Sequence, residues 1–146
     1  MAFKCPDRQR KAQRDSKARD PEIYAFERTL TSRETGESYF VVKVGKTGLW
    51  RHRSQRYANP RCQPKRWACT LPVEANVVHV PVPGMAEAEV AEALAKMVIE
   101  RHLKFPSPCG MKEHYLHLSI NEAEEILREA ARRATLWVGD YIREEL

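Results

Sequence analysis

The chain has 146 residues, a net charge of +5 and an apolar fraction of 42%, which fits one globular domain and leaves little room for a second. No apolar run reaches membrane-spanning length, and the charged N-terminus lacks the apolar region of a secretion signal. We therefore expect a soluble intracellular protein, cytoplasmic or, in a eukaryote, nuclear. Its four cysteines are expected to be free thiols.

Basic charge is concentrated in the first half of the chain. Residues 1–20 hold seven Lys or Arg against three Asp without apolar periodicity, which predicts a basic disordered arm. Residues 43–66 hold eight Lys or Arg and no acid, whereas residues 87–146 hold twelve acids against eight bases. Trp50 and Tyr57 lie among the cations, and this mixture suits phosphate contacts and base stacking. Nucleic acid, either DNA or RNA, is therefore the expected partner, although such a run can also be a solvated helix face.

Residues 22–30 and 39–44 are rich in β-branched and aromatic residues and flank a polar loop that contains Gly36, which predicts an antiparallel hairpin. A short helix is expected from residue 49 to about 58. Its Leu49, Arg53 and Tyr57 are spaced four residues apart, so Arg53 is expected in the middle of an apolar stripe. An arginine placed there can extend to the surface or aim its guanidinium at a site beside the sheet.

Residues 77–82 predict a third strand, in which Pro81 indicates a sheet edge or a strand end. A helix follows over about 86–103, with Val90, Leu94, Val98 and Arg101 on one face. Ser119 to Glu122 form a capping box that opens a last helix to about residue 136.

These elements predict an α/β chain of the α+β type with a small three-stranded, mostly antiparallel sheet flanked by helices. The domain would span residues 21–118, and the extra C-terminal helix, within residues 119–146, would pack on it. Gly45-Lys46-Thr47 does not end a nucleotide-binding P-loop, because Phe40 stands where that loop needs another glycine.

Two further motifs lie on the predicted hairpin and the helix after it. The first strand carries Glu22-Ile23-Tyr24, and the second carries Lys43-Val44-Gly45-Lys46-Thr47. Arg53 follows eight residues after the glycine, and Tyr57 and Asn59 come four and six residues later. Together with a glutamate-bearing helix after the third strand, this order resembles the GIY-YIG nuclease superfamily, especially its small phage-type and bacterial branches.

The resemblance implies a metal-dependent DNA endonuclease that hydrolyses phosphodiester bonds. It assigns Tyr24 to orienting or deprotonating the water, Arg53 to binding the phosphate and Lys46 to assisting it, while Lys43 takes part of a tyrosine's positioning role. A glutamate on the later helix would hold Mg²⁺ or Mn²⁺.

Two glutamates compete for the metal-binding role. Glu92 fits the family spacing, but helical periodicity points it away from the face of Val90, Leu94 and Val98. Glu87 ranks second, because the same periodicity places it on that core-facing stripe. Both residues can instead be acids that stabilise the start of a helix.

Side chains around the Arg-bearing helix would supply sequence-tolerant contacts to nucleic acid. These are Lys46, Trp50, Arg51, His52, Arg56, Tyr57, Arg61, Lys65 and Arg66. One alternative is a catalytically inactive binding module of the same fold, since Glu22 and Lys43 replace residues of the family motifs. Another is a protein-interaction domain that docks a partner through its acidic C-terminal helix.

Overall fold

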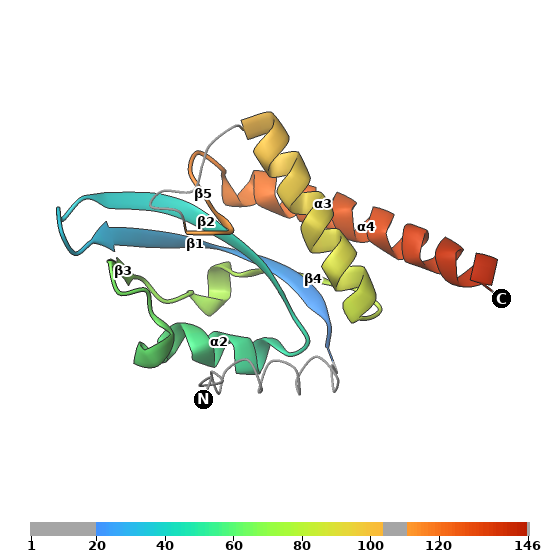
Figure 1. Cartoon of the computed structure of the whole chain (residues 1–146), viewed down its shortest axis with the longest axis horizontal. Coiled ribbons are helices and arrows are strands. Elements are labelled where there is room, and N and C mark those ends of the chain that lie inside the picture. Colours follow the sequence, from blue (N-terminus) through green and yellow to red (C-terminus); the bar gives the residue numbers. More distant parts are fainter. Residues whose placement is uncertain (1–19, 104–110, 146) are drawn as a thin grey trace, which may run out of the picture.

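The computed structural model describes residues 20–103 and 111–145, so the predicted arm over residues 1–20 lies almost wholly outside the described residues. The described part contains a five-stranded sheet and three α-helices (Figure 1). The strands are β1 (Glu22–Ser32), β2 (Ser38–Thr47), β3 (Trp67–Cys69), β4 (Val78–Pro81) and β5 (His114–Tyr115). The helices are α2 (Trp50–Ala58), α3 (Met85–Leu103) and α4 (Ile120–Glu145).

The hairpin of β1 and β2 is the centre of the sheet and confirms the antiparallel pairing predicted from sequence. Its register puts Tyr24 opposite Gly45 and Phe26 opposite Lys43. Because alternate residues of a strand point to opposite faces, Tyr24, Phe26 and Arg28 share one face of β1. Helix α2 covers this face, and α3 and α4 lie on the other side of the sheet (Figure 1).

The remaining strands extend the sheet on both sides of the hairpin. β3 and β4 pair with opposite ends of the same edge of β1, and β5 pairs with β2 at Val42 and Lys43. Pro81 ends β4, as the sequence indicated. The α/β class is confirmed, but the expected number of three strands is wrong. β3 and β5 have only three and two residues, which is too short to leave a periodic signal.

The buried face of α3 overlaps the predicted one but is rotated from it, so Val90 and Leu94 are only partly buried against the core. Ala88, Ala91, Ala95 and Ile99 are buried, whereas Val98 is 40% exposed. Small residues let α3 approach α4 closely, and α4 contributes alanines of its own to the same core, among them Ala123, Ala130 and Ala134. The buried face is therefore set by alanine, whose weak hydrophobicity made it less visible in the sequence than Val90 or Leu94.

The predicted capping box at the start of α4 is present. The Ser119 hydroxyl oxygen accepts a hydrogen bond from the Glu122 backbone N–H at 3.0 Å, and the Glu122 carboxylate accepts one from the Ser119 N–H at 3.4 Å. The helix continues to Glu145, beyond the predicted end near residue 136. In the described part of the chain, no helix combines the length and the apolar character needed to span a bilayer.

Candidate functional site

Two tyrosine hydroxyls meet between β1 and α2. Tyr24 is 1% exposed, and its hydroxyl lies 2.5 Å from the hydroxyl of Tyr57. Burial raises the pKa of Tyr24 well above its ordinary value and raises that of Tyr57 as well. Both phenols therefore keep their protons at neutral pH, so Tyr24 is suited to orienting a water by hydrogen bonding rather than to acting as a preformed phenolate.

Gly45 gives the Tyr24 ring its place. A Cβ atom at Gly45 would lie 2.5 Å from the Tyr24 hydroxyl oxygen and 2.6 Å from ring carbon Cζ, well inside van der Waals contact. The glycine of the Val44-Gly45-Lys46 motif is thus required by the close approach of the tyrosine across the hairpin, where the two residues are paired.

Arg53 lies on the sheet-facing side of α2, as its spacing from Tyr57 predicted. Its Nε atom is buried and has no hydrogen-bond partner among the described residues. A guanidinium keeps its charge in proteins, and a buried donor without a partner is costly. An arginine in this state is suited to a phosphate, which accepts two parallel hydrogen bonds from its fork.

Carboxylates and lysines form a continuous chain of ion pairs beside the tyrosines. The Glu113 carboxylate accepts from the ammonium groups of Lys43 and Lys96, each at 2.5 Å. The Lys96 ammonium also lies 3.3 Å from Glu92, whose carboxylate is 3.5 Å from the ammonium of Lys46. The two lysines of the second motif are therefore joined to Glu92 through shared charges.

The protonation of this chain follows from its geometry. Burial alone would raise the pKa of Glu113, but the ammonium groups of Lys43 and Lys96 lower it to about 2. Burial lowers the pKa of Lys43, and the Glu113 carboxylate opposes that shift. Since Lys43 Nζ lies 2.5 Å from Glu113 Oε2, we assign a charged ammonium–carboxylate pair to these two residues. Lys43 is therefore a cation near both Arg53 and Glu92 rather than a free base.

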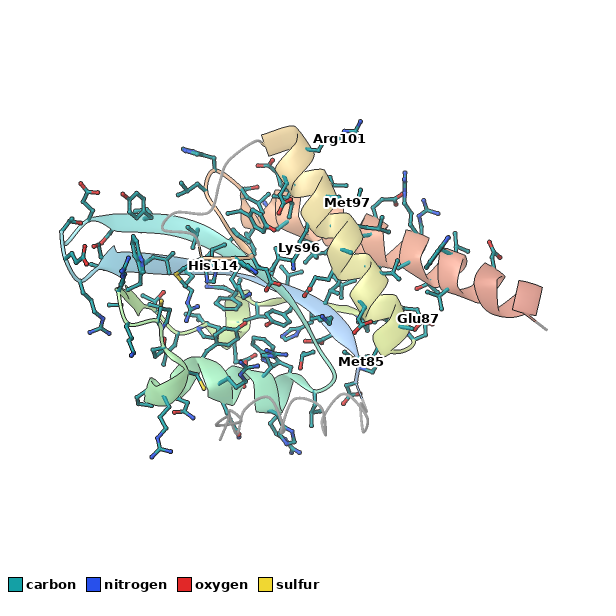
Figure 2. The ribbon with its side chains drawn as sticks, viewed as in Figure 1. Met85, Glu87, Lys96, Met97, Arg101 and His114 are labelled. Atoms are coloured by element: carbon teal, nitrogen blue, oxygen red, sulfur yellow. The ribbon has the colours of Figure 1, made fainter. Side chains whose placement is uncertain are left out.

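The two candidate metal ligands are in different places. Glu92 is 7% exposed and belongs to the lysine chain, contrary to the expectation that it faces away from the core. Glu87 lies at the start of α3, and its carboxylate approaches Gly84 (Figure 2). The structure thus brings Glu92, and not Glu87, to the other candidate residues. Glu87 fits the alternative of an acid at a helix start.

Glu92 alone supplies only one of the protein ligands that a divalent metal ion could use. Within residues 20–103 and 111–145, no three His, Cys, Asp or Glu side chains gather so as to hold a metal. This excludes a closed zinc-type ligand set there. Mg²⁺ binds through one or two carboxylates, keeps several waters and takes further ligands from phosphate. The one buried glutamate here could serve as such a carboxylate ligand, although Lys46 and Lys96 compete for its oxygens.

The predicted nucleic-acid contacts divide into packed and exposed residues. Trp50 packs against Tyr24, Phe26 and His79 with ring centroids 4.7, 6.3 and 5.2 Å away, and its indole N–H donates to Glu74. It is a structural residue of the aromatic cluster rather than an open platform for base stacking. The exposed cations are Arg51, Arg61, Lys65 and Arg66, whereas His52 and Arg56 are half-buried. These side chains lie on α2, which also carries Arg53, and on the segment that follows α2.

Three residues of the site were not predicted from the sequence. Glu113 has a left-handed backbone with φ of +67°, and only its tertiary position reveals its role. Arg28 follows Tyr24 and Phe26 at intervals of two residues along β1, so this spacing could have placed it on the same face as the two aromatic residues. His114 follows Glu113 and lies opposite Lys43 in the sheet, and Figure 2 shows Lys96 on the side of α3 toward it.

Residues 22–131 match the T5orf172 domain family, and this match covers most of the chain. The protein belongs to this family, whose domain is found in phage and bacterial nuclease-like proteins and is associated with nucleic-acid interaction. The GIY-YIG relationship inferred from the motifs stays a prediction. No curated protein and no solved structure matches the chain.

Proposed function

We propose that this protein is a GIY-YIG-type, divalent-metal-dependent endonuclease that hydrolyses phosphodiester bonds in DNA. The observation that carries the proposal is the buried Nε atom of Arg53, which has no hydrogen-bond partner among the described residues. It belongs to the same face as the Tyr24–Tyr57 hydroxyl pair. Phosphoryl chemistry needs an anion clamp and an oriented nucleophile, and these groups supply both.

In this proposal Arg53 binds the non-bridging oxygens of the scissile phosphate and stabilises the charge that grows on them. Tyr24 orients the attacking water, whose oxygen forms the new bond to phosphorus as the bond to the leaving sugar oxygen breaks. The water loses its proton to bulk solvent, and the leaving sugar oxygen takes up a proton from solvent. Lys43 and Lys46 add positive charge nearby. Glu92 would hold Mg²⁺ or Mn²⁺, which when bound supplies Lewis-acid stabilisation of the leaving oxygen.

The test is nicking of supercoiled plasmid with Mg²⁺ or Mn²⁺. Arg53→Ala is expected to reduce the rate by about 100-fold or more, as loss of one transition-state donor does in other enzymes. Gel-shift binding should persist, because the exposed cations of α2 and its following segment remain. Glu92→Gln should also abolish nicking, and Glu87→Gln is its matched control on the same helix. Wild-type nicking by Arg53→Ala would contradict the site assignment.

One observation favours a second candidate, a binding module without catalysis. Glu92 already contacts two ammonium groups, and these satisfy its charge without a metal. That candidate predicts salt-sensitive binding of nucleic acid and no turnover with either metal. The absence of any binding at low salt would instead favour the protein-interaction reading, in which the acidic α4 docks a partner.

A further inference from the structure

A pocket of about 290 Å³ opens beside Arg53 and is lined by more cations than the catalytic proposal uses. Arg28 and Arg56 line it together with Arg53 and Lys43. One wall comes from the segment after α2, where the Gln63 amide donates to the backbone carbonyl of Tyr57. The pocket is thus a continuation of the Tyr57 and Arg53 site, bounded by a wall fixed to α2.

Arg28 is the strongest sign that this pocket is built for an anion. Arg28 is buried, with only 6% of its surface exposed. Its Nε donates to the carbonyl of Thr70 at 3.0 Å, and its guanidinium carbon lies 5.1 Å from the centre of the Tyr57 ring. It makes no ion pair with a carboxylate among the described residues. Buried arginines normally have an acidic partner, because an uncompensated charge in a protein interior is unfavourable.

The side chain that Arg28 does contact carries no compensating charge. The Arg28 Nη1 atom lies 3.2 Å from Nε2 of His114, and His114 Nδ1 lies 2.8 Å from the carbonyl of Lys112. A carbonyl can only accept, so Nδ1 carries the proton and Nε2 accepts from the guanidinium. Burial, and then the cations Lys43 and Arg28, lower the pKa of His114 to about 4. The imidazole is therefore neutral and orients Arg28 without balancing it.

The charges around the pocket do not cancel. The carboxylate that lines it, Glu113, is shared by the ammonium groups of Lys43 and Lys96. The guanidiniums of Arg28, Arg53 and Arg56 form no ion pair within the described residues. A cavity whose lining carries more positive than negative charge, with low-dielectric walls, concentrates anions. Its volume is at the lower end for small-molecule sites, about 300–1,000 Å³, which suits a phosphodiester group better than a whole nucleotide.

We infer that Arg28 and Arg56, with Arg28 oriented by His114, form a second phosphate subsite next to the one at Arg53. The inference rests on the proposed function and narrows its substrate class. The preferred ligand is a nucleic-acid strand in which one phosphodiester occupies Arg53 while its neighbour occupies the pocket. An isolated phosphodiester would use only half of the site.

The experiment measures binding in EDTA, so that its outcome does not depend on turnover. A thymidine trimer has two phosphodiesters and a dimer has one, and each competes with a labelled 20-nucleotide strand in fluorescence anisotropy. The wild type is expected to bind the trimer about tenfold or more tightly than the dimer, as charge-assisted hydrogen bonds to a second phosphate would give. Arg56→Gln should remove most of this ratio.

Arg101→Gln is the matched control, because Arg101 is exposed on α3, which lies on the other side of the sheet from α2 (Figure 2). It should preserve the trimer-to-dimer ratio, and Arg53→Ala should weaken binding of both ligands. Arg28→Lys, which keeps the charge and loses the fork, should also reduce the ratio once urea unfolding shows that it folds. An unchanged ratio in Arg56→Gln, or equal losses in Arg101→Gln and Arg56→Gln, would overturn the subsite.

A turnover arm separates the subsite from the nuclease proposal. With bis(p-nitrophenyl) phosphate, which carries a single phosphodiester, Arg56→Gln should retain wild-type hydrolysis while its DNA nicking falls about tenfold. Equal loss on both substrates would overturn the second subsite. If the wild type hydrolyses neither substrate, the nuclease proposal fails, and the binding ratio in EDTA still decides whether the pocket recognises a second phosphate.

Discussion

Replacing Gly45 by alanine tests the packing that positions the catalytic candidate Tyr24. The new Cβ would lie 2.5 Å from the tyrosine hydroxyl oxygen, 2.6 Å from Cζ and 3.1 Å from Cε1. Tyr24 cannot simply move aside, since it is 1% exposed and hydrogen-bonded to Tyr57. Overpacking of this kind costs about 1–3 kcal/mol, a large share of the roughly 5–15 kcal/mol of a typical domain.

Urea unfolding measures this cost, and plasmid nicking measures its effect on the site. Displacing the Tyr24 hydroxyl by about 1 Å is expected to reduce nicking about 100-fold. Gly139→Ala is the matched control, because a Cβ there meets nothing within 4 Å. Gly139 lies within α4, where alanine should stabilise the protein by about 0.5–1 kcal/mol.

A double variant identifies the cause. Tyr24→Leu removes the ring atoms that Gly45→Ala would strike, so the second substitution should cost little in that background, and the two effects should be non-additive. The reasoning is refuted if Gly45→Ala has wild-type stability and nicking, or if its cost is the same with and without the tyrosine ring.

Three further predictions concern the charged groups around Tyr24. Wild-type stability should fall as the pH drops from about 6.5 to 4, by up to about 3 kcal/mol, because the folded state keeps His114 neutral while the unfolded chain takes up a proton. His114→Gln should lack this slope in urea unfolding, and an identical slope in the variant would contradict the assignment. Glu113→Gln should destabilise the protein by about 3 kcal/mol at pH 7, since it leaves Lys43 and Lys96 without their shared carboxylate. The wild-type contribution of Glu113 is present above about pH 4.5 and lost as the pH falls toward 2, so the two proteins should converge there. Lys96→Met should lower the Mg²⁺ concentration for half-maximal nicking several-fold, because it removes an ammonium that contacts Glu92; an unchanged or higher requirement would count against Glu92 as the ligand.

Much of the fold could be predicted because its central elements have clear local signals. Runs of β-branched and aromatic residues on either side of a polar loop with Gly36 indicated the β1–β2 hairpin, and the four-residue spacing of Arg53 and Tyr57 indicated one face of α2. The register of the hairpin, which places Tyr24 opposite Gly45, comes from the structure. The signals for the hairpin and for α2 each lie within a short stretch of the chain, so a single sequence is enough to reveal them.

The parts that could not be predicted depend on contacts between distant segments. Glu113 is separated by about seventy residues from Lys43, and nothing near it in the sequence marks it as the lysine's partner. Glu92 was expected to face away from the core because the heavier residues Val90 and Leu94 dominate a hydrophobic periodicity. The close α3–α4 contact instead favours the alanine face, and this rotation of α3 carries Glu92 inward.

The lysines of the site are paired with glutamates and the arginines of the pocket are not, and this difference explains why the site can still bind an anion. Lys43, Lys46 and Lys96 are each within 3.5 Å of a glutamate, so their charges are largely satisfied inside the protein. The arginines of the pocket have no such partner among the described residues, and arginine cannot relieve an unpaired charge by losing a proton. The positive potential left for a ligand is therefore carried by planar forks, which match the geometry of phosphate oxygens. It follows that Arg53→Lys should fail almost as completely as Arg53→Ala, because a retained point charge would not restore the bidentate contact.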